Sequence, residues 1–211
     1  MKKSSPYTLR WALREIIGEE ALIETLAAVL AEAAARSSIS YDSVVPIAQQ
    51  QAPEVMLEAW DWRLLIPRRS SGCGEWDHRI PVMQPGEIFE MPNIARYLVK
   101  RAASSGKWDP ETAAADLYCD IEEPQYDRMP ALVRQLEKQA QGLVIAAAGI
   151  NAACRNAGFY HRTGSLILIL KGGGIISPKL ASGICVPRPH SPVYEINPAV
   201  FPRKKGDADT M

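Results

Sequence analysis

Basic and hydroxyl side chains gather around one polar segment in the first half of the chain. Four arginines and two serines belong to it: Arg63, Arg68, Arg69, Ser70, Ser71 and Arg79. Guanidinium and hydroxyl groups on a polar loop are suited to hydrogen bonds with phosphate oxygens. The second half adds further candidates for the same role: His161, Arg162, Lys179 and Arg188. We predict these residues as contacts to nucleic acid, although similar clusters are also common on solvated strand edges.

Cysteine and histidine are placed too sparsely to form a metal site. Cys73, Asp77 and His78 share one loop, but zinc takes four ligands, commonly in close pairs, and the sequence offers no second pair. Cys185 lies shortly before His190, a proximity in sequence that does not define a geometry for nucleophilic attack. The sequence therefore predicts no metal, no cofactor and no catalytic constellation, and the protein is not expected to be an enzyme.

Lys171 precedes three consecutive glycines at 172–174, a combination that raises the question of phosphate binding. A P-loop places its lysine after the glycines and before a helix, whereas here Ile175 follows. The end of a helix or a hairpin turn explains the glycines better. The preceding run at 165–170 is compatible with both, because its place in the chain favours a helix and its composition favours a buried strand.

Glu90 and Glu195 lie at equivalent places in a segment that occurs twice. In both copies two apolar residues and a Pro-basic pair, Pro67-Arg68 or Pro178-Lys179, come first. A polar stretch follows, and then an aromatic-Glu-apolar triplet and a Pro. A repeated carboxylate is compatible with paired acid-base chemistry. Alternation along a strand instead predicts that both carboxylates point outward while their neighbours point inward.

Hydrophobic periodicity predicts helices before each repeated segment. In the first half the predicted helices are 7–17, 19–36, 40–50 and 53–63, and the predicted strands are 64–70 and 87–91. Helices at 93–103, 109–117, 130–141 and 143–156 follow. Ser40, Asn93 and Asp109 are expected to cap helices, and Pro53 and Pro110 suit first helical turns. Each half thus consists of helices followed by a two-stranded ribbon with a polar tip.

The predicted fold class is mainly α with small β-ribbons (α+β), in two units. The segments are an N-terminal domain at 1–106, a connection at 107–128, a C-terminal domain at 129–202 and a tail at 203–211. Between 107 and 127 the connection carries seven acidic residues and one basic residue. That composition favours a solvated linker with a short helix over a docking site for a basic partner. The charged tail is expected to be disordered.

The order of helices and ribbon resembles the winged-helix superfamily of helix-turn-helix domains, in two copies covering about 22–92 and 130–198. In DNA-binding members the third helix enters the major groove. The first such helix here carries Glu54, Glu58 and Asp61, which a phosphate-lined groove repels. The second, at 165–171, is almost entirely apolar. Both helices are poorly suited to reading bases.

Two functions remain open on this resemblance. One is a non-enzymatic transcriptional regulator that contacts double-stranded DNA mainly through basic wings. The alternative is an interaction or assembly module that binds another protein without DNA. Overall charge does not decide between them, because 24 basic residues balance 24 acidic ones. The second unit is short and rich in apolar residues, which predicts that these residues pack against the first unit or against a second chain in a homodimer.

The sequence also predicts the cellular compartment of the protein. Its 47% apolar content is sufficient for a packed core, yet no apolar run reaches the ~20 residues that cross a bilayer. The basic N-terminus leads into an amphipathic stretch, unlike a signal peptide. Four cysteines lie far apart, as is typical of reduced thiols. We predict a cytoplasmic protein without membrane contact.

Overall fold

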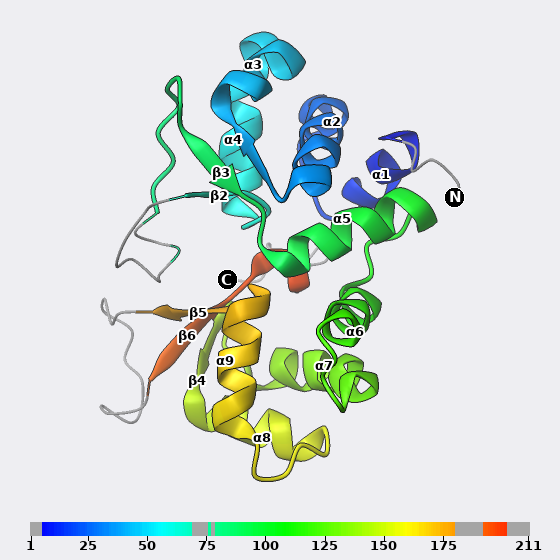
Figure 1. Cartoon of the computed structure of the whole chain (residues 1–211), viewed down its shortest axis with the longest axis vertical. Helices are drawn as coiled ribbons and strands as arrows, with labels where there is room; N and C mark the ends of the chain where they lie inside the picture. The colour runs from blue at the N-terminus through cyan, green and yellow to red at the C-terminus, as the bar shows by residue number, and fades with distance from the viewer. Residues whose placement is uncertain (1–5, 69–75, 77–78, 180–191, 202–211) are drawn as a thin grey trace.

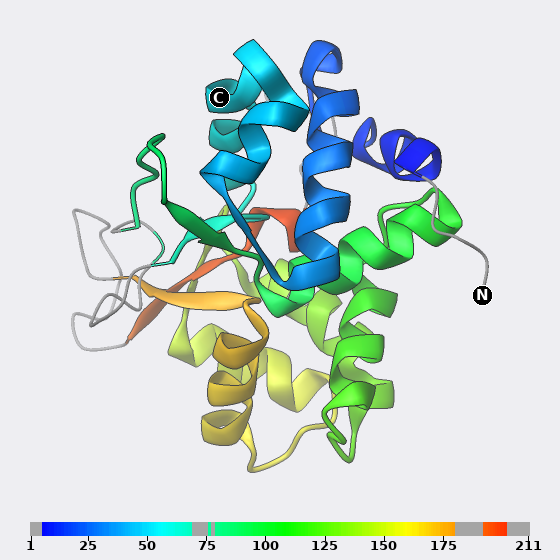
Figure 2. The ribbon, with the colours of Figure 1, turned by 45° about the horizontal axis from the view of Figure 1, so that its top comes forward.

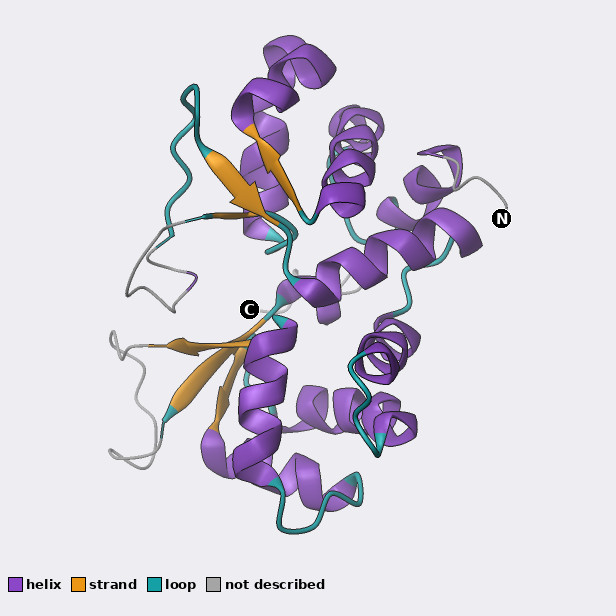
Figure 3. Ribbon diagram, in the orientation of Figure 1, coloured by secondary structure: helices purple, strands orange, loops and turns teal. Residues whose placement is uncertain are grey.

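The computed structural model describes residues 6–68, 76, 79–179 and 192–201. Within these residues the protein is mainly helical and has two small three-stranded antiparallel sheets (Figure 3). The predicted α+β class is confirmed. Figure 1 shows one sheet with its helices above the other, and helices α1, α5 and α6 along one side.

The first unit places three helices around the first sheet. Its elements are α2 (Glu20–Arg36), β1 (Ser38–Ser40), α3 (Tyr41–Ala48), the 3-10 turn η1 (Gln49–Gln51), α4 (Ala52–Asp61), β2 (Ile66–Pro67) and β3 (Ile88–Glu90). The strand order is β1-β3-β2. As expected, the Ser40 side chain caps α3 by accepting a hydrogen bond from the backbone N–H of Ser43, and Pro53 lies in the first turn of α4.

The second unit repeats this order. Its elements are α7 (Met129–Gln139), β4 (Val144–Ala146), α8 (Ala147–Asn156), α9 (Thr163–Gly173), β5 (Ile176–Lys179) and β6 (Val193–Ile196). The strand order β4-β6-β5 matches that of the first sheet. Two units of helices followed by a small antiparallel sheet are compatible with two winged-helix-like units.

The strand register confirms the repeat that the sequence shows. Phe89 pairs with Pro67 in the first sheet, and Tyr194 pairs with Pro178 in the second. Both copies therefore align at the proline of the Pro-basic pair and the aromatic residue of the triplet. The sheets are separate, because no strand of one is hydrogen-bonded to a strand of the other.

Four details differ from the sequence prediction or settle it. The short strands β1 and β4 were not predicted, and the helix expected at 143–156 begins only at Ala147. A three-residue strand leaves too little periodicity to separate it from a flanking helix. The ambiguous run at 165–170 is helical, and α9 ends where Gly174 adopts a left-handed conformation. The strand expected at 64–70 is described only as the two residues of β2.

Helices outside the repeat pack against both units. They are α1 (Pro6–Leu13), α5 (Asn93–Ser105) and α6 (Pro110–Asp120), with 3-10 turns η3 (Tyr126–Arg128) and η4 (Pro198–Val200). The Asp109 carboxylate caps α6, as predicted. The capping role predicted for Asn93 is wrong, because no side chain caps α5, which follows Pro92.

The acidic connection contains a buried helix face. Residues Ala113, Ala114, Leu117 and Tyr118 of α6 are buried, and the Tyr118 hydroxyl donates to the carbonyl of Ile169 at 3.2 Å. Apolar side chains of both units and of α6 form one continuous core. The proposed domain boundaries stay a prediction, and the tail lies outside the described residues. No described helix has the length and apolarity needed to cross a bilayer.

Candidate functional site

A buried ion pair joins the two units. Arg63, which follows α4, places Nη2 3.1 Å from Oε1 of Glu195 on β6, and both side chains are more than nine-tenths buried. The guanidinium also lies over the Trp60 ring, 4.5 Å from its centroid, and donates to the Trp60 carbonyl. A buried charge pair of this kind is costly to break from one side. Arg63 therefore fixes the first unit against the second sheet.

The expectation that Glu195 points outward to solvent is wrong, because its side chain is buried against Arg63 of the first unit. Arg63, which the sequence predicts as a contact to nucleic acid, is itself buried in this pair. Such a contact joins residues far apart in the sequence, so local patterns carry no signal for it.

The equivalent carboxylate of the first sheet is also paired with an arginine. Glu90 on β3 forms an ion pair with Arg79, and the Glu90 side chain remains 41% exposed. Two hydrogen bonds hold the backbone of Arg79. Its carbonyl accepts one from Nε1 of Trp60 at 2.9 Å, and its N–H donates the other to the carbonyl of Trp76. Arg79 thus has a defined position beside the junction of the units.

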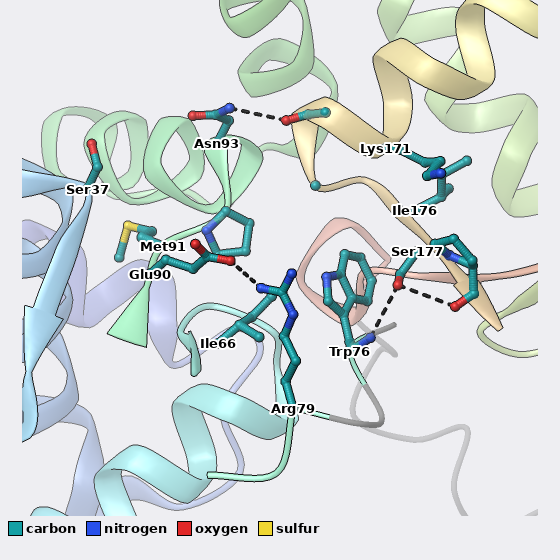
Figure 4. Close-up of a pocket in the computed structure, with 14 residues that line it drawn as sticks. Ser37, Ile66, Trp76, Arg79, Glu90, Met91, Asn93, Lys171, Ile176 and Ser177 are labelled. Carbon is teal, nitrogen blue, oxygen red and sulfur yellow. Dashed lines mark hydrogen bonds and ion pairs between the residues drawn. The ribbon is translucent and has the colours of Figure 1, made fainter. Parts of the chain in front are cut away.

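A pocket of about 370 Å³ lies at this junction (Figure 4). The first unit and the start of α5 contribute Ser37, Ile66, Trp76, Arg79, Glu90, Met91, Pro92 and Asn93. The second unit contributes Lys171, Gly172, Gly174, Ile176, Ser177 and Pro178. The walls combine two basic side chains, one carboxylate, hydroxyl and amide groups, and apolar surface.

Hydrogen bonds across the pocket tie its two sides together. Asn93 donates from its side-chain amide to the carbonyl of Gly172 at 3.2 Å. The backbone N–H of Trp76 donates to the Ser177 hydroxyl at 3.2 Å. In Figure 4 the bond from Asn93 lies above the Arg79 side chain, and the bond between Trp76 and Ser177 lies to its right. The shape of the pocket therefore depends on how the two units are placed.

The predicted nucleic-acid contacts that the structure describes differ in their surroundings. Arg162 makes hydrogen bonds of 2.5 and 3.1 Å to both carboxylate oxygens of Glu123, which raise the pKa of the guanidinium. His161 is exposed and has a positive φ of 61°. Arg68 is exposed after β2, and Lys179 ends β5. Arg69, Ser70, Ser71 and Arg188 lie outside the described residues.

The outer faces of the third helices, α4 and α9, differ in character. On α4 the exposed residues are Pro53, Glu54, Leu57 and Asp61. Burial raises the pKa of Glu58, although a hydrogen bond of 3.1 Å from Trp62 opposes that effect. On α9 Leu168 is 68% exposed, and Lys171, one turn further along the helix, is exposed as well. The α4 face therefore presents acidic residues to a phosphate-lined groove, and the α9 face presents one lysine beside an exposed leucine.

The residues considered for metal binding and nucleophilic catalysis, which are Cys73, Asp77, His78, Cys185 and His190, all lie outside the described residues. Among residues that are described, no three His, Cys, Asp or Glu side chains are grouped to hold a metal. Burial raises the pKa of the Cys154 thiol to about 11, so Cys154 is protonated at neutral pH.

Sequence reasoning missed the pocket. Lys171 and the following glycines were noticed, but they were explained by the helix end alone. Asn93 was assigned to a cap, and Trp76 carried no pattern at all. Only the packing of the two units brings these residues together.

The chain was also compared with known proteins. A protein-family model matches residues 11–204, and the chain belongs to that family. Neither curated proteins nor solved structures gave a match to the chain.

Proposed function

We propose that the protein is a non-enzymatic tandem winged-helix module that associates with protein partners, a second copy of itself among them. The outer face of α9 carries this proposal. In a DNA-binding winged helix the third helix presents polar and basic groups to the groove. Here the exposed face of α9 carries Leu168, which is 68% exposed, among small residues and a single lysine, Lys171. A large exposed leucine on such a face gains free energy when another protein covers it.

The charges around the third helices support the same proposal. Glu54 and Asp61 on α4 would face phosphates if that helix entered the groove. Arg63, Arg79 and Arg162, which the sequence assigned to nucleic acid, each pair with a carboxylate of the same chain. A DNA contact through any of them would have to compete with that existing pair.

Self-association through α9 is tested by Leu168→Glu. We expect the wild-type protein to sediment as a dimer at tens of micromolar and the variant to sediment as a monomer. Burying a leucine contributes about 1.5–3 kcal/mol, and a carboxylate at the same place would lose this and be left unpaired. Sedimentation velocity is the measurement.

Leu57→Glu is the matched control, because Leu57 is also an exposed leucine but lies on α4 of the first unit, whereas α9 belongs to the second. It should leave the dimer intact. A wild-type protein that is monomeric at this concentration removes the second copy as a partner. A Leu168→Glu variant that still dimerises shows that α9 is not the contact.

DNA binding through the wings is the second candidate, and the placement of the ribbons favours it. In both units the strand ends that lead into the ribbon loops, of β2 and β3 in the first unit and of β5 and β6 in the second, lie on the same side of the molecule (Figures 1 and 2). Arg68 and Lys179 stand where the strands lead into the wings. One duplex lying along this side would pass Arg68 and Lys179 with its phosphate backbone.

Titration of a random duplex at several salt concentrations separates the candidates. The protein-association proposal predicts a Kd weaker than about 100 µM at physiological salt, the weak limit of non-specific binding. Wing binding predicts tighter, salt-dependent affinity. In that case Arg68→Ala with Arg69→Ala weakens binding to all sequences alike and lowers the salt slope by about two. Loss of sequence discrimination at an unchanged slope would instead mean that these arginines read bases.

A further inference from the structure

We propose that the pocket between the two units binds a small organic anion, a carboxylate or a phosphate monoester with an apolar body. This site takes Lys171 and Gly172 from the last turn of α9, one turn beyond Leu168, and the proposal does not depend on what Leu168 contacts. Three features of the pocket support it: its charge, its apolar walls and its position between the units.

Charge defines the class of ligand. The basic side chains in the walls are Arg79 and Lys171, and the acidic one is Glu90. Glu90 balances Arg79, with which it pairs. Lys171 has no carboxylate within ion-pair distance among the described residues. Lys171 thus supplies a positive charge that attracts an anion, and the guanidinium of Arg79 lies in the same wall.

The neighbouring polar groups suit the same ligand. The hydroxyl of Ser37 and the first turn of α5, at Pro92 and Asn93, lie in the wall. The unpaired N–H groups at the start of a helix carry partial positive charge and favour anions. These groups add to the two basic side chains and do not define the site by themselves.

Apolar walls and size exclude a bare inorganic ion as the best occupant. Ile66, Trp76, Met91, Pro92 and Ile176 face the cavity. The volume of about 370 Å³ lies at the lower end of the range, roughly 300–1,000 Å³, that is usual for small-molecule sites. A ring or a short hydrocarbon chain would contact these side chains while its acid group lies near Lys171 and Arg79.

The position of the pocket between the two units means that ligand binding affects how the units are docked. Because both units contribute walls, the ligand binds only the arrangement in which the units are docked. Binding therefore stabilises that arrangement by mass action. Occupancy of the pocket is in this way coupled to the relative placement of the two ribbons.

Isothermal titration calorimetry on the full chain tests the proposal with four probes: phenyl phosphate, benzoate, inorganic phosphate and the neutral benzyl alcohol. We expect phenyl phosphate or benzoate to bind with a Kd below about 1 mM at low salt, which corresponds to about 4 kcal/mol. Lys171→Gln should weaken this binding about fivefold or more, since it removes the charge that Glu90 does not balance. Lys138→Gln, at an exposed lysine on α7, should leave it unchanged.

The outcomes are distinct. Preference for phenyl phosphate over benzoate, or the reverse, identifies which acid group fits. No binding of either probe up to about 5 mM overturns the proposal, and so does equal affinity of Lys171→Gln and wild type. Benzyl alcohol binding as tightly as benzoate would show that charge is not recognised. Inorganic phosphate binding as tightly as phenyl phosphate would show that the apolar walls add nothing, and the organic part of the proposal would fall.

Discussion

Replacing Glu195 by Ala should lower the free energy of unfolding by about 3–5 kcal/mol, the usual cost of removing one partner from a buried ion pair. The change leaves the Arg63 guanidinium buried between the units without its carboxylate. Most of the penalty comes from that unpaired charge and not from the lost attraction. Urea denaturation followed by circular dichroism measures the loss.

The repeat offers a matched control. Glu90 occupies the equivalent strand position and also pairs with an arginine, but it is much more exposed. Glu90→Ala should therefore cost only about 1 kcal/mol, since water screens an exposed pair. Replacing both buried partners, with Arg63→Met and Glu195→Leu together, should recover much of the stability. Equal losses for Glu195→Ala and Glu90→Ala would contradict the burial argument.

Gly174→Ala should be the second large effect, a loss of about 3 kcal/mol. Gly174 has φ +74°, a left-handed conformation that a residue with a side chain adopts only with strain. An added Cβ would also lie 2.6 Å from Cβ of Pro92, at the start of α5. Overpacking of this kind costs roughly 1–3 kcal/mol beyond the backbone strain. The measurement is again the midpoint and slope of urea unfolding.

Gly172→Ala provides the comparison two residues earlier. Gly172 lies within α9, and an added Cβ there would meet nothing within 4 Å. Alanine is the better helix former, by about 1 kcal/mol in a helix interior. This variant should thus be neutral or more stable than wild type. A Gly172→Ala protein as unstable as Gly174→Ala would mean that the whole glycine run, not its last residue, is conformationally required.

Local chemistry explains which parts of the fold were predictable. Ser40 caps α3 and Gly174 ends α9, because capping depends on a few neighbouring atoms that the sequence specifies. The equivalence of Phe89 and Tyr194 could also be predicted from the sequence, because both copies keep the same order of residue types. The strands β1 and β4 were missed, since three residues paired with a distant strand leave no periodic signal of their own.

The candidate site was less predictable than the fold. The basic side chains at 63, 68, 79 and 162 look alike in the sequence, yet only Arg68 is both exposed and without an ion pair among the described residues. What separates them is the docking of two units whose contacts span more than a hundred residues, as in the hydrogen bond from Trp76 to Ser177. The pocket exists only after that docking.

The pair of Arg63 and Glu195 also limits how the two copies can change over evolutionary time. A substitution at either position alone leaves a buried charge behind, so an organism that carries it bears a weakened protein until the other position follows. The first copy supplies the arginine and the second supplies the carboxylate. Neither half can then drift independently, and neither can be replaced by a duplicate of the other. The two copies share their order of elements and strand register, but their roles at the junction are unequal.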